Sequence, residues 1–249
     1  MSTQNEELMI QKLKVECGAA TVGKISQMMK DIQLSEGIMQ DFVNFNNGSN
    51  TVGGTEFNIE VLTNGTWPTQ ESPQLQIPPE LKTCAEKFSF WYKSQNSSKT
   101  LTWLYSNGQV EMQTLFSAKK YQLIVNVYQA CILCLFNKDE EITCAQIKQM
   151  CEMGDEKFKP AMMKLCNPKI KVLSKTVPKP QFGDDEKIKV NQNFNSKTIK
   201  TNIMPETKIT APKQEETSAN EKQIAKERSF VIQAHAVKVM KAQKSYRFQ

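Results

Sequence analysis

The 249-residue sequence predicts an α+β fold in which helices precede and follow a small antiparallel sheet. Three observations lead to this prediction. Apolar residues recur at three- and four-residue spacing near the N-terminus, alternating segments occupy the middle, and a helix–turn–helix–strand–loop–strand order follows. The expected parts are the end of a helical bundle at 1–46, an α/β domain at 47–137, a winged-helix domain at 138–203, a linker at 204–220 and an incomplete second winged helix at 221–249.

Residues 12–45 are expected to form two amphipathic helices, because their apolar positions follow the helical repeat. Residues 35–37 (Ser-Glu-Gly) interrupt that repeat, and Ser35 is expected to cap the second helix. Two such helices cannot bury their own apolar stripes, so this part needs further helices or a partner. The turn-rich residues 44–54 are expected to form a loop.

Residues 101–116 are expected to form a β-hairpin. Its turn is placed at Asn107 and Gly108, because a two-residue hairpin turn favours this pair, which accepts positive φ. Residues 57–62 (FNIEVL) alternate in the same way and are expected to add a strand. A lone hairpin is only marginally stable, so residues 79–92 are expected to cover the sheet as a helix.

The most apolar run of the chain, residues 123–136, is long enough to favour a buried helix. The β-branched Val125 and Val127 leave the start of that helix open. Cys131 and Cys134 have CxxC spacing, but no second Cys or His pair follows at the spacing of zinc ligands. We therefore interpret them as small apolar residues on a helix. Seven cysteines without an export signal are expected to be reduced thiols.

A winged-helix pattern follows. Thr143 and Gln146 have capping-box spacing and should begin one helix, and Pro160 is expected in the first turn of the next. Residues 171–175 and 187–190 are expected to form the two strands around the wing.

Winged helices often bind DNA, so a nucleic-acid-binding protein is the alternative function from a different class. The expected recognition helix carries Lys157, Lys159 and Lys164 but neither Arg nor Asn for base edges. Acidic residues offset the lysines of the wing, so we do not expect nucleic acid as a partner.

Residues 201–220 have little apolar content and are expected to be a linker. Residues 221–246 are expected to form a helix whose apolar arc, with Ile232, Val237 and Met240, packs inward. From Lys222 to residue 249, seven basic residues against one acidic residue, Glu227, equal the whole net charge of +6.

The blocks LTNGTWP, IPPEL and FWYKSQNSSKTLTWLYSNGQVEMQTLF resemble the middle of the cullin homology domain, and the resemblance runs from about Leu13 to about Lys244. It implies a scaffold subunit of a multi-subunit ubiquitin ligase, with no catalytic role and no cofactor of its own. It also places a strand-to-helix junction near Asn126. Measured against the family's pattern, the upstream helical repeats and the end of the second winged helix are expected to be absent.

The resemblance implies that a RING-H2 zinc protein docks on the sheet by adding a strand, with a ubiquitin-conjugating enzyme reached through it. Each side chain of the candidate platform could equally be part of the core. The platform consists of Asn58, Ile59, Glu60, Val61, Leu62, Thr63, Trp67, Pro68, Leu101 and Trp103.

The segment AVKVMKAQK resembles the cullin segment in which a lysine is linked to a Nedd-type ubiquitin-like protein, and the acceptor position falls on Lys241. Lys238 is the competing lysine. An acceptor-like lysine argues against the unmodified cullin relative of the anaphase-promoting complex, which remains a second alternative. The single histidine, His235, has no predicted catalytic partner. We expect no membrane partner and a location in cytoplasm and nucleus.

Overall fold

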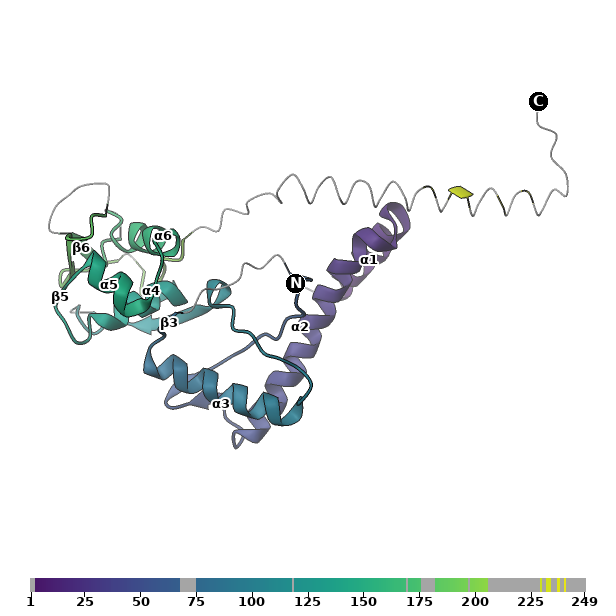
Figure 1. The fold of residues 1–249 in the computed structure, drawn as a ribbon, viewed down its shortest axis with the longest axis horizontal. Helices are drawn as coiled ribbons and strands as arrows, with labels where there is room; N and C mark the ends of the chain where they lie inside the picture. Colours follow the sequence, from purple (N-terminus) through teal and green to yellow (C-terminus); the bar gives the residue numbers. More distant parts are fainter. Residues whose placement is uncertain are drawn as a thin grey trace, which may run out of the picture. The chain divides into compact units, whose positions relative to one another are not determined.

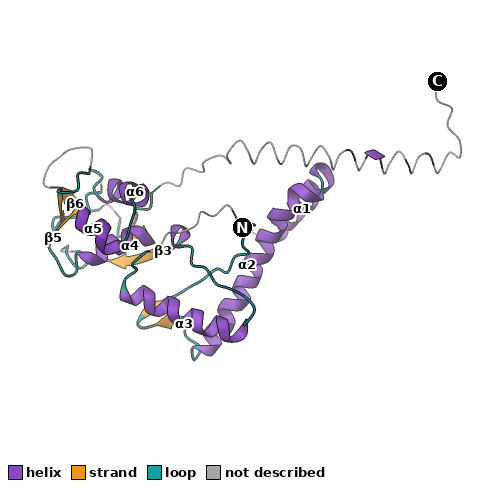
Figure 2. Cartoon of the chain, viewed as in Figure 1, coloured by secondary structure: helices purple, strands orange, loops and turns teal. Residues whose placement is uncertain are grey.

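The computed structural model describes residues 3–67, 75–117, 119–168, 170–175, 182–196 and 198–205, and the separate positions Ser229, Ile232, Gln233, Val237 and Met240. It has an α+β fold with two compact units (Figures 1 and 2). Of the described residues, the first unit holds those up to Asp31, Leu62–Thr66, and the separate positions Ser229, Ile232, Gln233, Val237 and Met240. The second holds Ile32–Val61 and the described residues from Trp67 to Pro205. No helix in the described ranges is both long and apolar enough to cross a membrane.

The first three described helices are longer than the later ones, and the described strands are short. The helices are α1 Thr3–Cys17, α2 Ala19–Phe45, α3 Pro79–Gln95, α4 Val127–Leu135, α5 Cys144–Cys151 and α6 Asp155–Leu165, with a 3-10 helix η1 at Tyr105–Asn107. The strands are β1 Thr51–Val52, β2 Thr55–Glu56, β3 Gln109–Gln113, β4 Gln122–Asn126, β5 Glu141–Thr143, β6 Leu173–Lys175, β7 Lys187–Val190 and β8 Lys200–Asn202. They form sheets in the orders β1-β2, β3-β4-β8 and β5-β7-β6.

The break between the N-terminal helices lies at Gly18, and the prediction of a break at residues 35–37 was wrong. Gly18 has a φ of 87°, a left-handed conformation that glycine adopts at little cost. Helix α2 continues through Ser35, and the Ser35 side chain caps no helix end. It is buried, with 3% of its surface exposed, and it bonds to the backbone of Val61 instead.

The two-residue hairpin turn lies at Gly53 and Gly54, between β1 and β2. Their φ values are 58° and 85°, the positive values that this turn requires at both positions. The predicted turn at Asn107 and Gly108 was wrong, because the chain there forms η1 and Gly108 has a φ of −71°.

Strand β3 instead pairs with β4 in antiparallel register, from Gln109 opposite Asn126 to Gln113 opposite Gln122. Strand β8 joins the other side of β4 in parallel. The predicted linker therefore begins too early at residue 201, because β8 is hydrogen-bonded and the following Ile203 has 1% of its surface exposed.

The strand-to-helix junction expected near Asn126 is confirmed. Asn126 Oδ1 accepts from the N–H of Gln129 at 2.8 Å, and the Asn126 N–H donates to Gln129 Oε1 at 3.1 Å. This capping box ends β4 and begins α4. It settles the start that the sequence left open, because Val125 belongs to the strand and Val127 to the helix.

The elements α4, β5, α5, α6, β6 and β7 follow one another in winged-helix order, and β7 lies between β5 and β6. The capping box of Thr143 and Gln146 is confirmed, as is β7. Strand β5 was not predicted. The first wing strand is shorter than expected, because β6 begins at Leu173.

Helix α6 begins at Asp155, so Pro160 is its sixth residue and the prediction that places it in the first turn was wrong. Two features favour the early start. The acidic Asp155 and Glu156 suit a helix N-terminus, and Phe158 is fully buried from the first turn. These contributions outweigh the backbone hydrogen bond that a proline removes.

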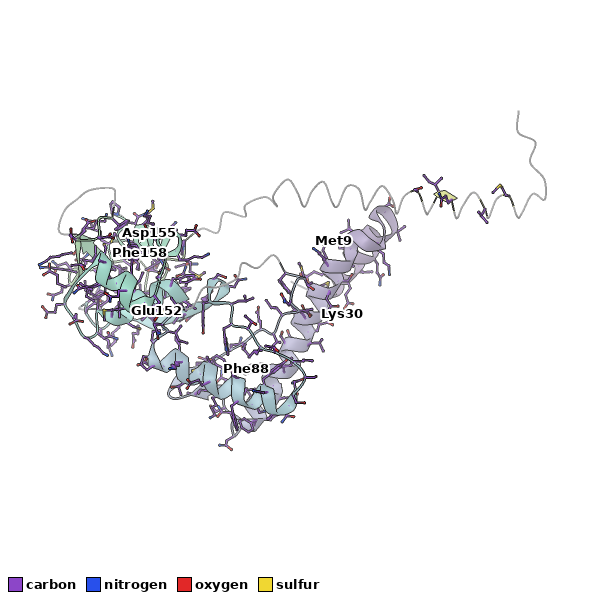
Figure 3. All side chains as sticks on the ribbon, viewed as in Figure 1. Met9, Lys30, Phe88, Glu152, Asp155 and Phe158 are labelled. Atoms are coloured by element: carbon purple, nitrogen blue, oxygen red, sulfur yellow. The ribbon has the colours of Figure 1, made fainter. Side chains whose placement is uncertain are left out.

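Two hydrophobic cores lie within the second unit. The larger one joins β4, α4 and the winged helix without interruption, since α4 contacts both α5 and α6. The smaller one, called the aromatic cluster here, lies between the end of α2, β1 and α3. Figure 3 labels a member of each, Phe158 on α6 and Phe88 on α3. The aromatic cluster consists of Phe42, Val52, Cys84, Phe88, Trp91 and Tyr92.

Candidate functional site

The aromatic cluster brings two separate segments of the predicted docking platform onto one surface. Phe42 is its centre, with ring centroids 5.2 Å from Phe88 and 5.4 Å from Trp91, both edge-on. Four platform residues from two distant stretches of the chain pack against this cluster. They are Ile59, Val61, Leu101 and Trp103.

The side chains of residues 57–61 alternate in burial as predicted, which indicates an extended segment. Phe57, Ile59 and Val61 are half-buried against the aromatic cluster, whereas Asn58 and Glu60 are exposed. No ladder joins this segment to another strand in the described part of the chain. The prediction of a sheet strand was therefore wrong in its pairing, although the alternation typical of a strand is present.

A serine from α2 occupies one side of this segment. Ser35 Oγ donates to the carbonyl oxygen of Val61 at 2.9 Å and accepts from the N–H of Val61 at 2.8 Å. Both backbone groups of Val61 therefore bond to one hydroxyl. The Ile59 N–H bonds to the side chain of Asn58 at 3.1 Å.

An aspartate of α2 makes the corresponding contacts within the first unit. Asp31, with 3% of its surface exposed, accepts from the Thr63 N–H at 2.9 Å and from Thr63 Oγ1 at 2.7 Å. Gln27 Nε2 donates to the same carboxylate at 3.0 Å. This buried carboxylate is thus surrounded by donors, as a buried anion requires.

The opposite side of residues 57–61 is an open edge. Successive backbone groups of an extended strand point to alternate sides, so those of Asn58 and Glu60 point away from Ser35. Among the residues that the structure describes, none bonds to the backbone of Asn58 or Glu60. Unpaired N–H and C=O groups of this kind can take up another strand. We call residues 58–60 the open edge.

Residues 101–104 form the second flank of the surface and, contrary to the prediction, belong to no described strand. Trp103 Nε1 donates to Ser89 Oγ of α3 at 3.2 Å, and the indole meets Phe88 edge-on at 6.2 Å between centroids. A hollow of about 360 Å³ adjoins Trp103, Ser89 and Tyr105. It could receive a side chain of a docked segment.

The remaining predicted site residues that the structure describes are not among those packed against the aromatic cluster. Leu62 and Trp67 are half-buried, and Thr63 is exposed. Pro68, Lys238, Lys241 and His235 lie outside the described residues.

The separate described positions Ser229, Ile232, Gln233, Val237 and Met240 are helical. Ile232, Val237 and Met240 are exposed, with 68%, 44% and 48% of their surface accessible, contrary to the expectation that they pack inward.

Two of the lysines considered for nucleic-acid binding make contacts within the winged helix. Lys159 pairs with Asp155 of its own helix at 3.1 Å. Lys175 pairs with the buried Glu186 at 3.7 Å and lies 3.5 Å from the centroid of the Phe182 ring. This arrangement gives no support to the nucleic-acid alternative, which needs cations directed at phosphates.

The thiols of the CxxC pair lie on the core helix α4. Burial raises the pKa of Cys131 to about 12, and burial followed by the charge of Glu80 raises the pKa of Cys134. Burial likewise raises the pKa of Cys151 to about 11. The thiolate is the reactive and metal-binding form, so these thiols behave as small apolar side chains. No group of possible metal ligands occurs among the described residues.

Sequence reasoning missed Ser35 and Asp31, which hold the platform in place. A signal was available, because two small polar residues lie four positions apart in an otherwise amphipathic helix. Buried polar groups at such spacing need partners from another segment.

Comparisons with known proteins extend these observations. The Cullin alpha+beta domain family matches residues 61–194, and the Cullin alpha solenoid domain family matches residues 1–39. Cullin-2 of Arabidopsis thaliana is 28% identical over 241 residues, 96% of this chain and 32% of that protein. Cullin-4A of Mus musculus is 28% identical over 244 residues, and Cullin-3A of Arabidopsis thaliana is 29% identical over 248 residues, each match covering 98% of this chain. The chain spans about a third of the length of these curated relatives.

Proposed function

Because this chain belongs to the cullin family, we propose that it acts as a scaffold of a multi-subunit RING ubiquitin ligase. It holds a RING-H2 zinc protein and, through it, a ubiquitin-conjugating enzyme. Its role is to place these partners, and it contributes no catalytic side chain. We expect this work to take place in the cytoplasm and the nucleus.

The observation that carries the proposal is the open edge of Asn58 and Glu60. Its backbone groups are free of hydrogen bonds to described residues, while the same segment is fixed on its other side by Ser35. A strand from the RING partner would satisfy these groups and gain affinity from the main chain. Side chains of that strand would contact Trp103 and Leu101 on the aromatic cluster, and these contacts would make the docking specific.

Docking is tested by coexpressing the chain with a RING-H2 protein and purifying through the partner. Glu60→Pro removes an N–H that makes no bond to the described residues, so it weakens docking by about tenfold without disturbing α2. Glu60→Ala is the matched control, because it keeps the N–H and should copurify like the unchanged chain. Equal recovery of the Glu60→Pro variant would contradict docking at this edge.

The proposal includes modification of Lys241 by a Nedd-type ubiquitin-like protein. Its support is the resemblance of AVKVMKAQK to the cullin acceptor segment. An unperturbed lysine has a pKa of about 10.4, so its ammonium group must first lose a proton to the conjugating machinery. The neutral amine then attacks the carbonyl carbon of the thioester that joins the modifier to its conjugating enzyme. The C–N isopeptide bond forms, the C–S bond breaks, and the cysteine thiolate of the enzyme is the leaving group.

Lys241→Arg keeps the charge and removes the acceptor amine. Incubation of the RING-bound chain with the modifier cascade should give almost no product with this variant. Lys238→Arg is the matched control and should be modified normally. Peptide mass mapping that places the isopeptide bond on Lys238 would refute the assignment.

A further inference from the structure

We infer that Ser35 is a positioning residue that holds the open edge in the conformation that a partner strand can join. The inference rests on the docking function proposed above. It concerns a side chain of α2 that need not touch the partner.

The Ser35 hydroxyl makes the two hydrogen bonds to Val61 that a residue of a neighbouring strand would make. In an antiparallel ladder, both the N–H and the C=O of one residue bond to the same residue opposite. Ser35 Oγ makes both of these bonds to Val61, as donor at 2.9 Å and as acceptor at 2.8 Å. A hydroxyl can do so because it carries one donor and two acceptor lone pairs.

The spacing of the helix suits this role. Two residues of a strand advance by about 6.6 Å and four residues of a helix by about 6 Å, so alternate strand residues can meet every fourth helix residue. Ser35 bonds to Val61 in the second unit, and Asp31 bonds to Thr63 in the first. Met39 and Ile59 continue the same steps as apolar neighbours of the aromatic cluster.

This arrangement decides which side of the segment is open. With the groups of Val61 bonded to α2, those of Glu60 and Asn58 must point the other way. Without Ser35, the Val61 groups would lose their partners and the segment would sample other conformations. A partner strand would then have to order the segment itself, and such ordering lowers affinity.

The test compares Ser35→Ala with the unchanged chain in two measurements. Amide hydrogen exchange in the free chain should speed up about tenfold or more at Val61, whereas amides of α4 keep their rates. Affinity for the coexpressed RING-H2 protein, measured by calorimetry, should fall by about tenfold.

Two further variants separate positioning from a general loss of stability. Ser35→Thr keeps a hydroxyl and should restore slow exchange at Val61 and most of the affinity. Ser94→Ala removes a hydroxyl that bonds to Trp91 O within α3, at 2.6 Å, and should change neither measurement.

Each outcome is informative. If the unchanged chain binds the RING-H2 protein, Glu60→Pro binds about tenfold more weakly and Ser35→Ala binds normally, the docking function is supported and the role of Ser35 is refuted. Faster exchange throughout α2 and α3 in Ser35→Ala would show a merely structural residue and also refute it. If the unchanged chain binds no RING-H2 protein, the docking function is refuted, and so is the inference that depends on it.

Discussion

At the scale of single residues, buried polar side chains decide where segments distant in sequence meet. Gln129 is fully buried and closes the capping box of α4. Its Nε2 also donates to the carbonyl oxygen of Ile203 at 3.0 Å. Asn46 similarly donates to the carbonyl oxygens of Ser49 and Thr51 at the end of α2. Buried amides of this kind specify one arrangement, because any other leaves a donor without an acceptor.

Asp155 provides a pH test at this scale. Hydrogen bonds from Lys148 and then Lys159 lower the pKa of its carboxyl, with Nζ–O distances of 2.6 Å and 3.1 Å. A lowered pKa stabilises the fold above the pKa of the unfolded chain, about 3.9, and this contribution is lost as the pH falls further. The midpoint of urea unfolding should therefore differ between the unchanged chain and Asp155→Asn at pH 7, and the difference should shrink at pH 3.

Asp185→Asn is the control for that measurement, because the Asp185 carboxylate makes no ion pair with the described residues and is exposed. It should change the urea midpoint equally at both pH values. A difference for Asp155→Asn that persists undiminished at pH 3 would show that its ion pairs contribute nothing.

At the scale of elements, glycines explain where the chain turns, for two different reasons. Gly53 and Gly54 supply the positive φ values of the β1-β2 turn. Gly108 has an ordinary φ and is needed for space, since a Cβ there would lie 2.5 Å from Val127 Cγ2. The Gly108 carbonyl also accepts from the N–H of Val127 at 3.3 Å, so the backbone must approach the start of α4 closely.

Gly108→Ala should therefore destabilise the fold by about 1–3 kcal/mol, because the buried, β-branched Val127 cannot move aside cheaply. Asn107→Ala should change stability by less than about 0.5 kcal/mol, since Asn107 is exposed and its φ is not positive. Thermal unfolding by circular dichroism measures both. A large effect of Asn107→Ala would instead support the hairpin turn that the sequence suggested.

At the scale of the whole molecule, β8 returns the chain after the winged helix to the sheet of β3 and β4. The backbone of β4 bonds to Ile199 and Ile203 on either side of β8, and Ile203 enters the larger core. The sheet and the winged helix therefore share one core, to which β8 and the following Ile203 contribute.

Truncation tests this contribution. A chain that ends at Pro205 should unfold at the same temperature as the full chain, because β8 and Ile203 are retained. A chain that ends at Ser196 loses β8 and the buried Ile203 and leaves Gln129 Nε2 without its acceptor, a loss on the order of 3 kcal/mol or more. Identical melting of the two chains by differential scanning calorimetry would show that β8 does not contribute to the core.

The sequence by itself determined the features that depend on neighbouring residues. The capping box of Thr143 and Gln146, helix α3 and the strand β7 follow from local hydrogen bonds and periodicity. The family resemblance added the β4–α4 junction and the platform residues, and Lys241 remains a prediction of the same kind.

Only the tertiary structure decided which groups are paired and which are left open. Residues 57–61 look like a sheet strand in sequence, yet their partner is the hydroxyl of Ser35 on a helix more than twenty residues away. Gly108 is likewise required because Val127 leaves no room for a Cβ atom. Strand β8 is a strand because it pairs with β4. Strand pairing and close approach are set by contacts between residues far apart in the chain, and local propensity carries no information about which distant group supplies them.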